Sequence, residues 1–133
     1  MALTPRSLFL GLIGAPYASD LFTSALRIAD AAVRKEHRVT MWTCGYATAL
    51  TVAEASDRKP RDTLAWDTVY PSPAAVAAHL LDRSDGRLTW LICRYCAEER
   101  AAMNQMSGVR IRPPYEFVQR AMAADVCLVL GTK

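Results

Sequence analysis

Two cysteines in the second half of the chain are the residues best suited to chemistry. Cys93 ends an apolar run that begins at Leu88, and Cys96 lies in the helix-forming run that follows directly. A thiol at such a junction faces unpaired helix amides, which can lower its pKa from about 8.5 and raise its thiolate fraction. Glu98 and Glu99 act in the opposite direction, so the net pKa shift stays open. We expect Cys93 to be the working nucleophile.

A thiolate in this position suits sulfur transfer. It can attack a donor persulfide, keep the outer sulfur as a Cys–S–SH group and present that group to an acceptor. Such a site needs access for a partner and a nearby cation, which Arg94 or Arg100 could supply. Cys96 has two interpretations: it resolves the persulfide by forming a disulfide with Cys93, or it is a half-buried thiol without a role.

Metal binding and a disulfide scaffold are less favoured uses of the four cysteines. Zinc sites usually have four ligands and one CxxC pair supplies two, so we expect no metal, although Cys44 could join the pair. Cys44 and Cys127 lie in or beside apolar strand-like runs, where small buried thiols are common. This pattern is typical of proteins in a reducing compartment.

Length and composition predict one soluble domain over residues 1–133. The chain is 52% hydrophobic and 22% charged, and its net charge of +3 comes from scattered arginines, so nucleic acid is an unlikely partner. No stretch is long enough to cross a membrane. Residues 6–18 resemble a short signal peptide but also form a strand–turn–helix pattern, which we favour. We therefore expect a cytoplasmic location.

The hydrophobic pattern alternates between strands and helices. This alternation predicts a mostly parallel sheet of four or five strands in a flavodoxin-like three-layer α/β/α sandwich. A charged loop at 56–62 is a candidate lid. The expected strands are 7–14, 37–43, 88–92, 108–112 and 126–130, and the expected helices are 21–35, 74–83, 95–105 and one after Pro113-Pro114, with a further short helix possible at 47–55.

Ligands of such sheets bind outside the carboxyl ends of the strands, at a topological switch point. The turns at 14–19 and 44–46 map to that edge, as does Cys93. The side chains that we expect to line the site beside Cys93, Cys96 and Arg100 are Tyr17, Cys44, Tyr46, Arg94 and Tyr95.

The segment around Cys93 resembles one in the DsrE/DsrF-like sulfur-carrier family (DsrEFH and Tus-type relays). The shared features are a cysteine at a strand end, a helix start of small residues and Arg100 seven positions on; the first strand–turn–helix and the last strand are also similar. The resemblance implies a persulfide on Cys93, persulfide donor and acceptor proteins, and a homo-oligomer (dimer, trimer or hexamer). Ala101 stands where the family usually has glycine, and Cys96 is an additional thiol.

Two other functions stay open beside a carrier or sulfurtransferase. One is a non-catalytic nucleotide-binding or flavin-binding module that uses Gly11 and Gly14, although these glycines equally fit a tight turn and no lysine follows to meet phosphate. The other is a thiol-redox protein that uses the Cys93–Cys96 pair. The sulfur-carrier interpretation requires no cofactor.

Overall fold

Helices and strands alternate through residues 4–131, which the computed structural model describes; residues 1–3 and 132–133 of the expected domain lie outside this range. Each predicted strand is present, as is each predicted helix in some form. In chain order the elements are β1 (Ser7–Ile13), α1 (Leu21–Arg34), β2 (Arg38–Cys44), a 3-10 helix η1 (Gly45–Thr51), α2 (Pro73–Arg83), β3 (Leu88–Cys93), α3 (Arg94–Glu99), β4 (Val109–Arg112), α4 (Glu116–Ala123) and β5 (Val126–Gly131).

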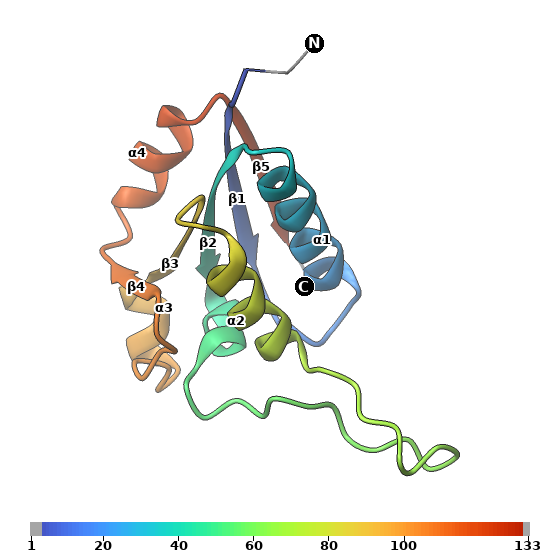
Figure 1. Cartoon of the computed structure of the whole chain (residues 1–133). Coiled ribbons are helices and arrows are strands. Elements are labelled where there is room, and N and C mark those ends of the chain that lie inside the picture. Colours follow the sequence, from blue (N-terminus) through green and yellow to red (C-terminus); the bar gives the residue numbers. More distant parts are fainter. Residues whose placement is uncertain (1–3, 132–133) are drawn as a thin grey trace.

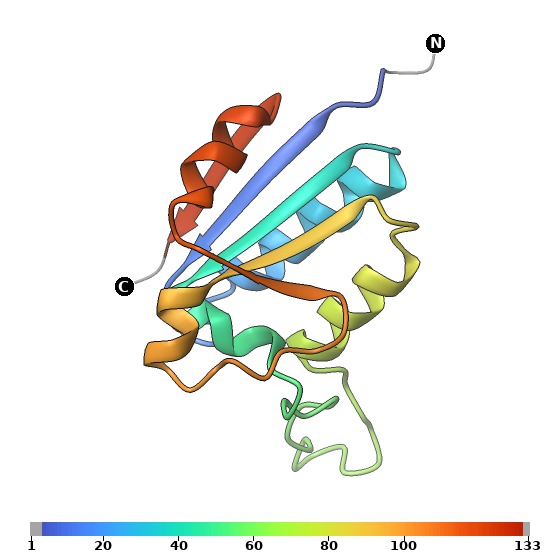
Figure 2. The ribbon, with the colours of Figure 1, turned by 90° about the vertical axis from the view of Figure 1, so that its left-hand side faces the viewer.

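The five strands form one sheet in the order β4-β3-β2-β1-β5. Every neighbouring pair is parallel, which confirms the expected α/β class and makes the sheet fully parallel. Helices α1 and α2 cover one face and α4 covers the other (Figure 1). The strands run toward the edge where α3 and η1 lie (Figure 2), so this carboxyl edge is where a site is expected.

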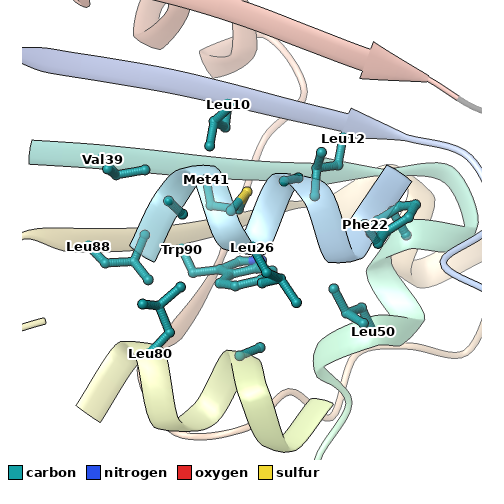
Figure 3. Close-up of a cluster of buried hydrophobic side chains, with 14 of the residues drawn as sticks. Leu10, Leu12, Phe22, Leu26, Val39, Met41, Leu50, Leu80, Leu88 and Trp90 are labelled. Atoms are coloured by element: carbon teal, nitrogen blue, oxygen red, sulfur yellow. The ribbon is translucent and has the colours of Figure 1, made fainter. Parts of the chain in front are cut away.

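Two hydrophobic clusters fill the space between these layers. The larger one lies between the sheet and the pair α1 and α2 (Figure 3). It forms because alternate residues of each strand point to the same face. The smaller cluster lies on the α4 face, with partly buried side chains packed around it. The members of the first cluster include Leu10, Met41, Trp90, Leu26 and Leu80, all labelled in Figure 3. The buried members of the second are Phe9, Trp42, Leu91 and Cys93.

Phe117 supplies the ring contacts that hold α4 against the sheet. No residue of this helix is fully buried. Its ring meets Phe9 edge-on with centroids 5.2 Å apart, and Trp42 edge-on at 5.7 Å. Gly11 provides the room: a Cβ at this position would lie 3.2 Å from the Phe117 ring. Packing against Phe117 therefore accounts for Gly11, one of the two glycines considered for nucleotide binding.

The helix expected at 95–105 is shorter in the structure and ends at Glu99. The amide of Ala102 donates to the carbonyl of Ala97 at 2.8 Å, and that of Ala101 to Glu98 at 3.4 Å. These two hydrogen bonds are the Schellman pattern, which needs a left-handed residue just after the helix, and Ala101 has φ 52°. The possible helix at 47–55 is instead the 3-10 helix η1.

The helix expected at 74–83 is present as α2, and the charged loop, the candidate lid, does not cover the end of β3. Ser72 caps α2 by accepting from the amide of Ala75 at 3.1 Å. The loop between η1 and α2 extends away from the sheet and from α3 in both views (Figures 1 and 2), so it leaves the end of β3 uncovered.

Residues 7–13 form β1, between β2 and β5, as the strand interpretation predicted. No helix within residues 4–131 is long and apolar enough to span a membrane.

Candidate thiol site

Three thiols meet at the carboxyl edge of the sheet. The Sγ atoms of Cys44, Cys93 and Cys96 all lie within 4.8 Å of one another. Cys44 ends β2 and Cys93 ends β3, and these strands pair in a register in which Thr43 is opposite Ile92, so the two cysteines are neighbours. Cys96 joins them from the first turn of α3. The fold thus adds a third sulfur to the CxxC pair.

Cys93, the thiol selected from the sequence, is the most buried of the three. Cys93 is only 3% exposed, while Cys44 and Cys96 are half-buried. Cys93 does lie at a strand end and immediately before a helix, as expected, but it does not stand open to solvent. A reagent approaching this edge therefore meets Cys96 or Cys44 before Cys93.

Burial also reverses the pKa shift that a helix start alone would produce at Cys93. Loss of water raises the pKa of Cys93, and the Cys96 thiol raises it further, while the backbone amides of Cys96 and Tyr95 compensate only in part. Burial raises the pKa of Cys44 to about 12, against the opposing effect of a hydrogen bond that the Trp42 indole Nε1 donates to its Sγ at 2.9 Å. Both shifts favour the protonated thiol, so the net pKa shift of Cys93, which the sequence left open, is upward.

Arg100 lies against the backbone of Cys96, and Tyr46 lies against Arg100. The Arg100 guanidinium stacks on the Tyr46 ring, 4.7 Å from its centroid, and its Nη1 donates to the backbone carbonyl of Cys96 at 3.2 Å. The same nitrogen pairs with Glu99 at 2.9 Å. The Nε of Arg100 is buried and has no hydrogen-bond partner within the described residues. A cation with an unused donor therefore borders the cysteines.

The side chains of three other predicted residues point away from this cluster or lie elsewhere. Arg94 forms an ion pair with Glu98 at 2.8 Å and is mostly exposed. Tyr95, between the two thiols in sequence, is 66% exposed. Tyr17 lines a separate hollow beside the loop that contains Lys59. Spacing in the sequence does not show which of these side chains face the thiols, because adjacent residues at the start of a helix point in different directions.

Two residues that matter to the site were not selected from the sequence. Trp42 was expected to be core, and it is, but its indole N–H also binds the Cys44 sulfur. Arg112 ends β4 directly opposite Cys93 in the ladder. Its Nε is buried without a hydrogen-bond partner in the part of the chain described, and it forms an ion pair with the Glu116 carboxylate at 3.9 Å. Finding Arg112 requires the strand order, which no local pattern contains.

The hollow between α1 and α2 is distinct from the thiol site. Leu26, Val76 and Leu80 contribute apolar lining, and Asp30 and Arg83 pair with each other at its border. It lies on the opposite face from α4 and includes no cysteine. We therefore place the chemistry at the thiols, where nucleophilic atoms gather.

Comparison with known proteins agrees with this architecture. No protein-family model matches the sequence. No curated protein matches it either. The crystal structure of ychN protein from E. coli is similar, with a TM-score of 0.75 over 94% of this chain and 99% of that one. The two proteins therefore share this parallel α/β fold. Sequence identity is 19%, so the likeness is one of fold, and the role of the thiols must be argued from their geometry.

Proposed function

We propose that this chain is a sulfur carrier that holds sulfane sulfur as a persulfide on Cys93 and passes it to a partner protein. The observation that supports this function is the gathering of three sulfur atoms within 4.8 Å at the carboxyl edge of the sheet. The DsrE-like fold adds support, because the family that the Cys93 segment resembles carries sulfur in this way. A carrier that depends on free thiols requires a reducing compartment, so we also propose a cytoplasmic location.

Loading requires no oxidant. The Cys93 thiol gives up its proton to solvent and its sulfur attacks the outer sulfur of a donor R–S–SH. The S–S bond of Cys93–S–SH forms, the S–S bond of the donor breaks, and R–S⁻ leaves. Delivery repeats this exchange with an acceptor thiolate, which regenerates Cys93. The outer sulfur extends about 2 Å beyond Sγ, so it approaches the half-buried layer of Cys96 and Cys44 where a partner can reach it. Multiple cycles of transfer would make the protein a sulfurtransferase.

Arg100 and Arg112 are suited to stabilise the loaded state. A persulfide ionises to Cys–S–S⁻, and each arginine has a buried Nε donor without a hydrogen-bond partner in the described structure. Arg112 adjoins Cys93 across β3 and β4, while Arg100 binds the carbonyl of Cys96. Charge-assisted hydrogen bonds from guanidinium groups are stronger than neutral ones, so they favour the anion.

Polysulfide treatment followed by mass spectrometry tests the carrier function. We expect an adduct of about 32 Da, one sulfur atom, on the peptide that contains Cys93. Cys93→Ser should remove it, and Cys127→Ser, which changes an exposed thiol on β5, should leave it unchanged. An adduct that persists in Cys93→Ser, or that occupies Cys127 alone, contradicts the proposal.

A thiol-redox activity is the second candidate, because Cys96 lies within 4.8 Å of Cys93. In this reaction the Cys96 thiolate attacks the inner sulfur of the Cys93 persulfide, HS⁻ leaves, and a Cys93–Cys96 disulfide forms. A loaded wild-type protein should then release sulfide and lose the adduct, whereas Cys96→Ser should retain it. Equal retention by both proteins favours the simple carrier.

We further propose that the chain self-associates through α4 and β5. β5 is an edge strand, and exposed apolar side chains lie on it and on the neighbouring helix. Val129 is 46% exposed, Val118 58% and Met122 82%. A free strand edge with apolar neighbours can pair with a second copy of itself. Val129→Lys should reduce the mass measured by light scattering, and Leu64→Lys, in the distant loop, should not; a monomeric wild type contradicts the proposal.

A further inference from the structure

We propose that Cys44, Cys93 and Cys96 form a binding site for a soft monovalent metal ion, Cu(I). The three Sγ atoms come from the ends of two neighbouring strands and from the first turn of a helix, and all lie within 4.8 Å of one another. A metal–sulfur distance of about 2.3 Å places the sulfurs of a trigonal site about 4 Å apart. Small side-chain rotations therefore bring the thiols to coordinating distance.

The number and type of donors favour copper over zinc. Thiolates are soft ligands that select Cu(I), zinc or iron–sulfur clusters. Structural zinc is almost always four-coordinate. Within residues 4–131, no further cysteine, histidine, aspartate or glutamate donor joins the three sulfurs at this distance. Three sulfurs without a fourth protein ligand suit a three-coordinate Cu(I) ion, which replaces the thiol protons and releases them to solvent.

The surroundings of the cysteines match the charge of such a complex. Three thiolates and one Cu(I) ion carry a net charge of −2. The Trp42 indole donates to the Cys44 sulfur at 2.9 Å, which orients this ligand from outside the coordination shell. Arg100 and Arg112 flank the cluster, and the buried Nε atom of each has no hydrogen-bond partner in the described structure, although Glu99 and Glu116 form ion pairs with these arginines. Half-buried Cys44 and Cys96 leave a path by which an ion can enter.

The exposed thiol Cys127 lies on β5 and is not part of this cluster, so it supplies a matched control. Reduced, metal-free protein is titrated anaerobically with Cu(I) in competition with a chromophoric Cu(I) chelator. We expect one tightly bound ion per chain, the same stoichiometry in Cys127→Ser, and at least about a tenfold weaker affinity in each of Cys44→Ser and Cys96→Ser. Trp42→Phe should weaken binding by about tenfold, as removal of an outer-shell hydrogen bond does.

X-ray absorption on the copper-loaded wild type measures the ligand set without relying on variants that could fold poorly. Three sulfur neighbours, with no nitrogen or oxygen, support the site. Two sulfur neighbours, or an affinity that Cys44→Ser leaves unchanged, would overturn it, since the CxxC pair would then bind alone. Retention of Zn²⁺ against excess Cu(I) would also overturn it. These experiments contain no persulfide, so their result is independent of the proposed carrier function.

Discussion

Replacement of Ala101 by glycine is expected to stabilise the protein. Ala101 follows α3 with φ 52°, in the left-handed region that costs a residue with a Cβ about 1–2 kcal/mol. Glycine removes this cost but gives the unfolded chain about 0.4–1 kcal/mol more conformational freedom to lose. The net effect is a gain of about 0.5–1 kcal/mol. Glycine is the residue that the Schellman geometry favours at this position.

Urea denaturation followed by circular dichroism measures this gain. A stabilisation of this size corresponds to a shift of about 0.4 M in the urea midpoint and about 2–4 °C in the melting temperature. Ala97→Gly is the control, because Ala97 is helical and buried, and we expect it to lose about 1 kcal/mol or more. Ala101→Val should also destabilise, since a β-branched residue fits the left-handed region poorly. A neutral or destabilising Ala101→Gly would refute the argument.

Three further predictions concern the α4 face, the thiols and the surface of α1. Phe117→Ala should lower stability by about 2–4 kcal/mol in urea denaturation, whereas Met122→Ala on the same helix should cost less than about 0.5 kcal/mol. Burial raises the pKa of Cys44 to about 12, so in reduced, metal-free protein its alkylation rate should rise about tenfold for each unit of pH between 7 and 10. Cys44 should react more slowly than the exposed Cys127 throughout this range. Rapid alkylation of Cys44 at pH 7 would contradict its burial. Burial opposes ionisation of Asp30, but the hydrogen bonds from Arg34 and Arg83 outweigh it and lower the pKa of this carboxyl from its usual value of 3.8. Asp30→Asn should therefore reduce the free energy of unfolding by less than about 1 kcal/mol at pH 7. The difference between the two proteins should disappear as the pH falls below the pKa of Asp30 in the folded protein.

The sequence by itself determined the elements and their order. Apolar runs bounded by turns predicted all five strands, and the helix expected at 74–83 is α2, because these signals depend on neighbouring residues alone. It also placed Cys93 at the junction of a strand and a helix, which the structure confirms. The end of α3 was missed because alanine at position 101 does not announce the left-handed conformation that glycine would.

Only the tertiary structure decided what surrounds Cys93. The strand order brings Cys44 to one side of Cys93 and Arg112 to the other. Both residues are distant from Cys93 in the sequence. Packing on the α4 face removes Cys93 from water, and this loss outweighs the amides of a short helix, so the pKa of the thiol rises. Hydrophobic periodicity reports which face a residue takes within its own strand. Which strands become neighbours depends on long-range contacts, and those contacts create the three-thiol site.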